Sequence, residues 1–335
     1  MKFPNWQAEN WRDAPENPVI RQTEGFILGE PQILTPGELD TQWHAFMHSF
    51  YGAHFTPYFQ HHTSADGIHW SCLQKWQWPV SASSLFFDKG EWILYYTAIS
   101  SEEERAEHHC NNFVCARTSK DLAHWSEPVY LLFPELPFER EHMDICYESI
   151  EARCPCMVKL AEDKYRLYYS AGTVMLEKCG YEEPKYVTFA EASSPLGPFK
   201  KYGAPVIAPD AALAHRNFGA GALKVFGSPE GLIGLYNSIY NDENGYHHSA
   251  INLIRSSDGI VWEEAPFNPM LPPAGEGWKA AFVYQLDLVR FGDALRLYYN
   301  ARNDWRDGVE AIGFSSIQSD FPVFKLWGDA WRRMG

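Results

Sequence analysis

The chain has 335 residues, of which 45% are hydrophobic and 16% aromatic, and its formal net charge is −15. The length fits either two domains or one large all-β domain, and the aromatic content favours strands. The acidic balance argues against nucleic acid and anionic membranes as partners, because both are bound through basic surfaces. Neutral polar substrates fit better, and flat aromatic faces suit stacking on sugar rings.

The cysteines and the first residues bear on the cellular compartment. Seven cysteines, an odd number with no C-x-x-C pair, predict reduced thiols rather than a disulfide framework or a zinc site. Residues 1–7 contain no apolar stretch typical of a secretory signal, and no apolar run reaches the length of a membrane span. We therefore expect a cytoplasmic protein without a cofactor or a catalytic metal, and the oligomeric state stays open.

Two sequence phrases alternate along the chain. The first is a strand, a turn and an aromatic strand, with a clear copy from Ser84 to Thr97. The second ends a further strand in a polar turn and an aromatic residue, as in Ser64-Ala65-Asp66-Gly67-Ile68-His69-Trp70, where Ser, Asp and Gly are turn formers. Copies of the first phrase fall at 31–48, 84–97, 157–170, 223–237 and 286–300, and copies of the second at 63–70, 118–125, 193–199, 256–262 and 315–324.

Five copies in 335 residues correspond to 335/5, or about 67 residues for each unit. A long repeat of short strands with a turn signature predicts a single-domain, all-β, five-bladed β-propeller. A two-sheet sandwich would not repeat the same two phrases five times, and we find no long helical stripe with a period of 3.6 residues. The expected blades are 24–79, 80–140, 144–206, 215–273 and 278–328.

The innermost strands of a propeller converge on its axis, so residues at their starts should form one mouth. These starts lie near Glu30 and within 81–84, 148–153, 215–217 and 278–285. Residues two apart on a strand face the same side, so Glu151 and Arg153 should point into the mouth together. The mouth is therefore predicted to be polar and aromatic, and to be assembled from five distant segments.

Two of these segments resemble known enzymes. Glu151-Ala152-Arg153-Cys154-Pro155, followed by the aromatic strand 165–170, and Gly29-Glu30-Pro31 resemble motifs of the five-bladed glycoside hydrolases of families 43, 32, 68 and 130. The resemblance covers most of the chain as architecture and these two motifs as chemistry. It implies that Glu151 is the general acid and Glu30 the base or nucleophile of glycoside cleavage, in which two carboxyl groups flank the scissile bond. Furanosides are typical substrates of several of these families.

Two features depart from that pattern. The second blade begins with Ser81-Ala82-Ser83-Ser84 and offers no third acid. In addition, Arg153 favours the ionised form of Glu151, which is unsuited to donating a proton. Asp144 or Glu148 could offset that charge or act as the acid, and Glu151 with Arg153 could instead hold sugar hydroxyls.

Further substrate-binding residues are expected at the starts of the last two blades. Alternation along the fifth inner strand predicts that Gln285 and Asp287 face one way and Tyr284 and Leu286 the other, so only one pair should line the axis. The predicted set is Arg153, Glu148, Asp144, His215, Arg216, Trp278, Gln285 and Asp287.

Three functions follow in order of preference. The first is hydrolysis of a glycosidic bond in an oligosaccharide. The second is transglycosylation or phosphorolysis, for which Arg153, Arg216 and Lys279 would supply cations. The third is a non-catalytic carbohydrate-binding propeller, which the missing acid of the second blade favours.

Overall fold

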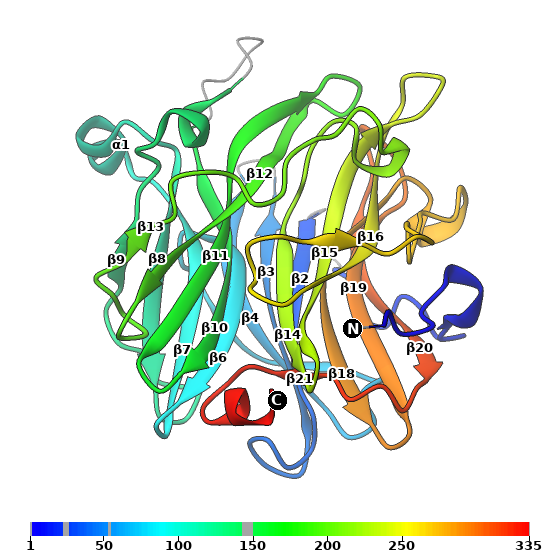
Figure 1. Cartoon of the computed structure of the whole chain (residues 1–335), viewed down its shortest axis with the longest axis horizontal. Coiled ribbons are helices and arrows are strands. Elements are labelled where there is room, and N and C mark those ends of the chain that lie inside the picture. The colour runs from blue at the N-terminus through cyan, green and yellow to red at the C-terminus, as the bar shows by residue number, and fades with distance from the viewer. Residues whose placement is uncertain (1, 23–26, 53–54, 143–149, 335) are drawn as a thin grey trace.

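The computed structural model describes residues 2–22, 27–52, 55–142 and 150–334, and its regular structure is nearly all β-strand (Figure 1). The strands are β1 (Arg12–Asp13), β2 (Ile27–Leu34), β3 (Trp43–Tyr51), β4 (Thr56–Ser64), β5 (Ser71–Trp76), β6 (Val80–Asp88), β7 (Glu91–Ile99), β8 (Asn112–Ser119), β9 (Val129–Leu132), β10 (Ala152–Ala161), β11 (Lys164–Leu176), β12 (Tyr181–Ala192), β13 (Lys200–Lys201), β14 (Leu223–Ser228), β15 (Gly231–Asn241), β16 (His247–Ser256), β17 (Glu263–Glu264), β18 (Phe282–Phe291), β19 (Ala294–Arg302), β20 (Glu310–Gln318) and β21 (Phe324–Lys325). Helix α1 (Glu102–His108) and the 3-10 helices η1 (Ala8–Asn10), η2 (Pro137–Arg140), η3 (Ala214–Arg216), η4 (Gly277–Lys279) and η5 (Ala330–Arg333) complete the described elements.

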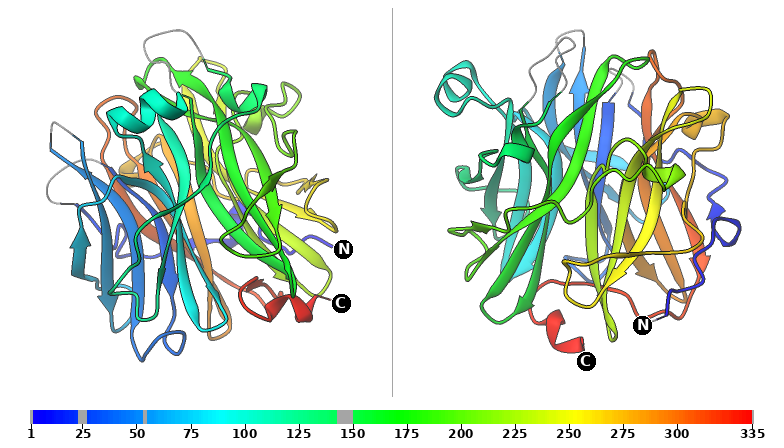
Figure 2. Two further views of the ribbon diagram at one scale, coloured as in Figure 1. Left: turned by 90° about the vertical axis from the view of Figure 1, so that its left-hand side faces the viewer. Right: turned by 45° about the horizontal axis from the view of Figure 1, so that its top comes forward.

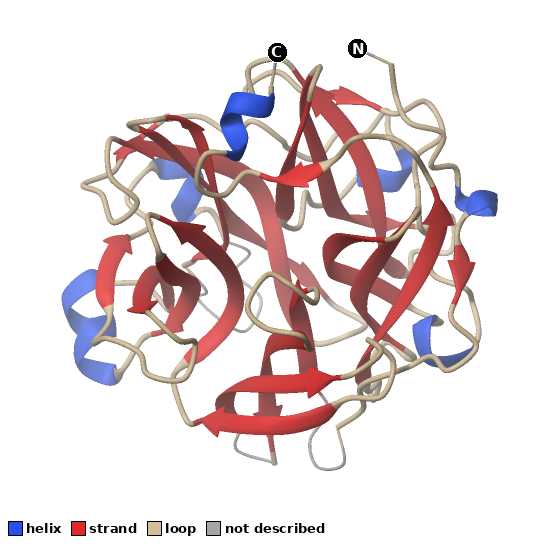
Figure 3. Ribbon diagram, turned by 90° about the horizontal axis from the view of Figure 1, so that it is seen from below, coloured by secondary structure: helices blue, strands red, loops and turns tan. Residues whose placement is uncertain are grey.

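The strands pair as five antiparallel sets of four. The sets are β2-β3-β4-β5, β6-β7-β8-β9, β10-β11-β12-β13, β14-β15-β16-β17 and β18-β19-β20-β1, and each is called a blade below, numbered 1 to 5 in that order. Figures 2 and 3 show the blades standing around a common axis. The all-β propeller fold predicted from the sequence is confirmed.

The inner strands and the chain ends close the ring. β2 contacts both β6 and β18, and β10 contacts both β6 and β14. The fourth strand of blade 5 comes from Arg12 and Asp13, which lie outside the blade boundaries expected from the sequence. Near the other end of the chain, β21 pairs with β14 of blade 4. Strand pairing as well as packing therefore closes the ring. The blade boundaries expected from the sequence remain a prediction.

The hydrophobic core lies between neighbouring blades. Phe46 and Phe59 of blade 1, for example, pack in one cluster with Leu85 and Leu94 of blade 2. Similar clusters join blades 2 and 3, 3 and 4, 4 and 5, and 5 and 1. Each blade thus buries both of its faces, which explains why aromatic and aliphatic residues are so plentiful in every strand.

The Leu-Tyr-Tyr phrase of blades 2, 3 and 5 ties each of these blades to the next one. The first tyrosine of Leu-Tyr-Tyr donates its hydroxyl to a backbone carbonyl in the polar turn of the following blade: Tyr95 to Pro195 at 2.7 Å, Tyr168 to Gly259 at 2.8 Å and Tyr298 to Gly67 at 2.8 Å. A polar residue two positions after each of these tyrosines bonds to the inner strand of the following blade, or to the residues just before it. The Thr97 hydroxyl accepts from the Cys154 N–H, and the Ser170 hydroxyl donates to the Gly221 carbonyl. The side-chain Oδ1 of Asn300 accepts from the Glu30 N–H. The phrase repeats because these contacts between blades repeat.

The polar turns have the local bonding that their sequence predicts. The Ser64 hydroxyl accepts the Gly67 N–H at 2.9 Å, and Asp66 Oδ1 accepts the N–H groups of Ile68 and His69, both at 2.8 Å. Gly67 has a φ of 74°, and a Cβ there would lie 2.8 Å from the Tyr298 hydroxyl. Glycine is required at this turn both by its conformation and by the close approach of the neighbouring blade.

Every inner strand carries one extra residue at the same level. In β2 the pairing of Gly29 with His48 gives way to that of Gln32 with Phe46, a shift by one residue, and the same shift occurs in β6, β10 and β18 and just before β14. Such a bulge redirects side chains and breaks the alternation of faces. We call the first bulge position of each inner strand its axial position; these positions are Glu30, Ser81, Cys154, Gly221 and Tyr284.

Glu30 and Cys154 have the left-handed backbone typical of a bulge, with φ of 58° and 55°. Both precede a proline, Pro31 or Pro155, which has no N–H to leave unpaired.

Within the described residues, no helix is long and apolar enough to cross a membrane.

Candidate active site

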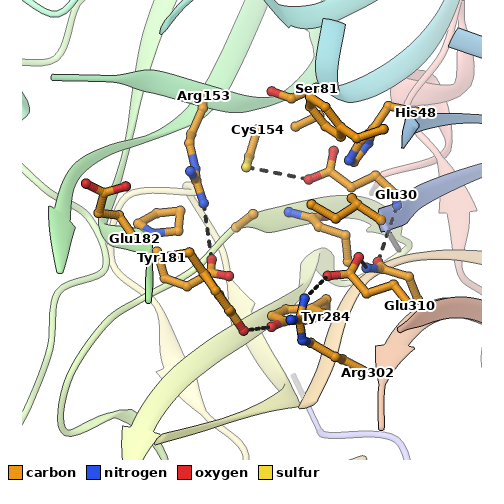
Figure 4. A pocket seen from close by; sticks show the side chains of 18 of the residues that line it. Glu30, His48, Ser81, Arg153, Cys154, Tyr181, Glu182, Tyr284, Arg302 and Glu310 are labelled. Carbon is orange, nitrogen blue, oxygen red and sulfur yellow. Dashed lines mark hydrogen bonds and ion pairs between the residues drawn. The ribbon is translucent and has the colours of Figure 1, made fainter. Parts of the chain in front are cut away.

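A pocket of about 550 Å³ opens at the end of the axis where the inner strands begin (Figure 4). Its walls include residues at or beside the axial position of every blade: Glu30, Ser81, Cys154, Ala222 and Tyr284. This volume is in the range of small-molecule sites. The bulges therefore bring five distant segments of the chain to one cavity.

Four glutamates from three strands line this pocket: Glu30 and Glu310 are buried, and Glu182 and Glu183 are partly buried. Glu30 comes from β2, as predicted, whereas Glu183 on β12 and Glu310 on β20 were not predicted. Burial raises the pKa of Glu183 to about 7 against the opposing charge of Arg153. Burial also raises the pKa of Glu310 to about 7 against the opposing charge of Arg302. Two carboxyl groups are thus poised to exchange protons near neutral pH.

Glu30 is held by groups from blades 2 and 3. Its Oε2 accepts the Ser83 N–H at 2.8 Å, and the Cys154 thiol lies 3.6 Å from its Oε1. Burial raises the pKa of Glu30, while the charge of Lys224 and the Ser83 N–H act in the opposite direction. The carboxylate is therefore fixed in one orientation, with donors that favour its ionised form.

Arg153 links two acidic groups at the wall of the pocket. Its guanidinium contacts Glu151 Oε2 at 2.9 Å and Glu183 Oε2 at 3.1 Å. Glu151 and Arg153 are thus in contact, but Glu151 does not line the pocket, contrary to the expectation that both would point into the mouth, and it is 7% exposed. The Asn112 amide, oriented to suit its neighbours, also donates to Glu151 at 3.0 Å. Glu151 thus holds Arg153 in place, and Arg153 presents its charge to Glu183.

His48 faces the same pocket as a neutral imidazole. Burial and the charge of Arg153 lower its pKa to about 3. Its Nδ1 is buried and has no hydrogen-bond partner in the described part of the chain. Because this nitrogen is enclosed, His48 contributes an uncharged ring to the pocket wall.

The prediction for the fifth inner strand needs a correction. Tyr284 and Gln285 both line the pocket, whereas strict alternation allowed only one of them. The bulge between Val283 and Leu286 is the reason, because the extra residue turns two successive side chains toward the axis. The Tyr284 hydroxyl lies 2.6 Å from the hydroxyl of Tyr181, which also lines the pocket (Figure 4).

Four predicted binding residues lie outside the pocket lining. His215 and Arg216, on η3, lie 3.5 and 3.3 Å from the Glu264 carboxylate, so they brace blade 4. The Trp278 ring stacks on Tyr299, with centroids 5.3 Å apart. Asp287 accepts the Ile33 N–H at 2.8 Å and the Lys325 ammonium at 2.7 Å, which joins blade 5 to blade 1 and to β21.

Asp144 and Glu148, the alternative acids, lie outside the described residues. Among the residues that are described, no group of three or more His, Cys, Asp or Glu side chains is placed to hold a metal ion. The pocket lining offers carboxyl groups, arginines and neutral polar side chains to a ligand.

The structure resembles several solved structures at low sequence identity. They include a putative glycoside hydrolase from Bacteroides ovatus (14% identity, covering 94% of this chain and 98% of that one, TM-score 0.64). Others are a GH62 hydrolase in complex with xylotriose (11%, 92% and 97%, 0.62) and the β-1,2-mannobiose phosphorylase of Listeria innocua (13%, 92% and 97%, 0.60). No protein-family model and no curated protein matches the chain. The fold is thus that of the glycoside-hydrolase-like propellers, and no single family is assigned.

Proposed function

We propose that this protein cleaves a glycosidic bond of an oligosaccharide in the axial pocket. The observation that carries the proposal is the gathering of Glu30, Glu183 and Glu310 around one cavity, with two pKa values raised to about 7. Glycoside cleavage needs one protonated carboxyl group to protonate the leaving oxygen and one ionised carboxylate on the other side of the bond. Environments that separate the protonation of neighbouring carboxyl groups supply such a pair.

We assign the general acid to Glu183 rather than to Glu151. Glu183 lines the pocket and is about half protonated near pH 7, whereas Glu151 lies behind Arg153. Glu30 keeps its predicted role as base or nucleophile: burial raises its pKa, and the Ser83 N–H and Lys224 oppose that effect by stabilising its negative charge. In this scheme Glu183 donates its proton to the departing oxygen, while Glu30 activates water or attacks the anomeric carbon.

The test is a panel of aryl furanosides, aryl pyranosides and oligosaccharides, followed by two substitutions. Glu30→Gln and Glu183→Gln should each lower kcat by about 10² to 10⁴, the usual contribution of a general acid or base. Glu151→Gln is the matched control, and it should reduce activity less because that side chain does not line the pocket. Wild-type turnover in both pocket variants would refute the role assignment. Sugar binding without any turnover would favour the non-catalytic alternative.

Phosphorolysis is the second candidate. Arg153, Arg302 and Arg306 line the pocket and could bind phosphate as the attacking group, whereas the predicted cations Arg216 and Lys279 do not line it. Adding inorganic phosphate to the same panel separates the two reactions. Phosphate-dependent release of a sugar phosphate would support phosphorolysis, and phosphate-independent release would support hydrolysis.

A further inference from the structure

A second pocket adjoins the axial one on the rim of blades 4 and 5. Its volume is about 610 Å³, and Arg306 lines both pockets. The other residues used below are Tyr246, before β16, and Asp304 and Trp305, in the loop 303–309 between β19 and β20. A ligand that fills the axial pocket and extends past Arg306 would enter this second pocket.

The aromatic wall of the second pocket is fixed in position. Trp305 Nε1 donates to the His247 carbonyl at 2.7 Å, and the ring packs edge-on to His248 with centroids 5.4 Å apart. Tyr246, 41% exposed, meets Trp305 at an angle of 62° and a centroid distance of 5.0 Å. The Lys178 ammonium lies 3.6 Å from the centre of the Tyr246 ring. Rigid aromatic rings beside charged groups can contact the apolar face of a sugar while its hydroxyls are hydrogen-bonded.

The charges around this pocket balance. Lys178 and Arg306 oppose Asp242 and Asp304. The Arg306 guanidinium is exposed and makes no hydrogen bond or ion pair with any residue that the structure describes, so its donors are available to a ligand. Two cations against two anions suit a neutral sugar better than a uronic acid or a phosphate.

The loop 303–309 connects the second pocket to a carboxylate of the first. The Arg302 side chain donates to the backbone carbonyls of Asp304 and Arg306, both at 3.1 Å, and its guanidinium lies 3.6 Å from Glu310. A Cβ on Gly308 would lie 2.3 Å from the Asp304 carbonyl, so the loop is tightly closed. Arg302 thus contacts both the loop that lines the second pocket and a carboxylate of the first.

We propose that the second pocket is a distal subsite that binds a neutral sugar residue of the same oligosaccharide whose glycosidic bond lies in the axial pocket. This rests on the proposed function for the location of the cleaved bond. It adds the substrate class, since the substrate must be longer than the unit held in the axial pocket.

The experiment measures binding separately from turnover. Glu183→Gln protein is titrated with β-1,2-linked manno-oligosaccharides and with xylo-oligosaccharides, from disaccharide to tetrasaccharide, with tryptophan fluorescence and calorimetry as readouts. Arg306→Ala, Tyr246→Ala and Trp305→Ala are compared in this background. Tyr202→Ala is the control, because Tyr202 is similarly exposed, at 45%, and stacks on Phe189 rather than lining either pocket.

The expected result is a gain in affinity of about tenfold when chain length first reaches the second pocket, of the order of one aromatic contact. Tyr246→Ala should remove this gain without weakening the shortest ligand that binds, because Tyr246 lines only the second pocket. Arg306→Ala should also remove the gain, and Tyr202→Ala should leave it unchanged. Three results would overturn the proposal. They are an affinity that does not depend on chain length, a gain that survives in all three pocket variants, and no binding by either oligosaccharide series. Turnover by the wild type is scored separately, so length-dependent binding without turnover would remove the proposed function and keep the subsite.

Discussion

Replacing Glu183 by Gln should stabilise the protein at alkaline pH while removing its activity. Burial raises the pKa of this carboxyl group from 4.5 to about 7, so ionising it is harder in the folded chain than in the unfolded one. At about 1.36 kcal/mol for each pH unit, the difference corresponds to about 3 kcal/mol. Below pH 4.5 the group is protonated in both states and nothing is lost; as the pH rises through 7, the folded state loses the whole amount.

The glutamine variant has no proton to lose, so the two proteins should diverge in a defined pH window. Their free energies of unfolding should agree near pH 4 and differ by up to about 3 kcal/mol, in favour of Glu183→Gln, at pH 8. Arg153 keeps its ion pair with Glu151 in the variant. Urea unfolding at both pH values measures the difference, and Glu162→Gln, at a side chain 57% exposed, is the control. A variant that is less stable than the wild type at pH 8, or a difference that does not change with pH, would refute the reasoning.

Three other substitutions test the architecture of the site. Cys154→Ala removes a thiol hydrogen bond that lowers the pKa of Glu30, so the acidic limb of the pH–rate profile should move to higher pH; an unchanged limb would contradict that contact. Asp287→Ala leaves Lys325 without its partner and should lower the free energy of unfolding by about 3 kcal/mol in chemical denaturation, with binding affinity unchanged in the protein that remains folded. Gly221→Ala places a Cβ 1.7 Å from the Asn237 carbonyl at a φ of 58°, so it should cost about 2 kcal/mol or more, and near-neutral stability would count against this bulge.

The fold could be predicted because its repeated contacts leave repeated residues. The first tyrosine of Leu-Tyr-Tyr has to reach a turn in the next blade, and the turn itself needs Ser, Asp and Gly, so both phrases recur. Glu30 could be placed at the axis for the same reason, since it lies near the start of the inner strand of its blade. The expected blade 5, residues 278–328, left out Arg12 and Asp13 because they are more than 300 residues from Ser316 and Ser315, their partners on β20.

The rest of the site was missed because the search was restricted to the starts of inner strands. In an antiparallel blade the first and third strands run in the same direction, so their starts lie at the same end of the axis. Asn112, Glu183 and Glu310 all lie at or near the start of a third strand, and all three line the pocket. An acidic residue at the start of a buried third strand, as in Glu310-Ala311-Ile312, is a signal that could have found Glu183 and Glu310. The bulges carry no comparable signal beyond Pro31 and Pro155.

The bulges around the axis make the residues that line the pocket independent of the strand pairing that holds the fold together. An axial residue stands outside the regular ladder of its blade, so its side chain can change while the strand pairing on either side is kept. At Gly221 the Asn237 carbonyl closes the space, but Glu30, Ser81, Cys154 and Tyr284 all reach the cavity. A single substitution such as Ser81→Asp would therefore give the second blade the acid it lacks without changing the pairing of its strands. The ring is thus a scaffold in which the axial residue of each blade can be changed separately.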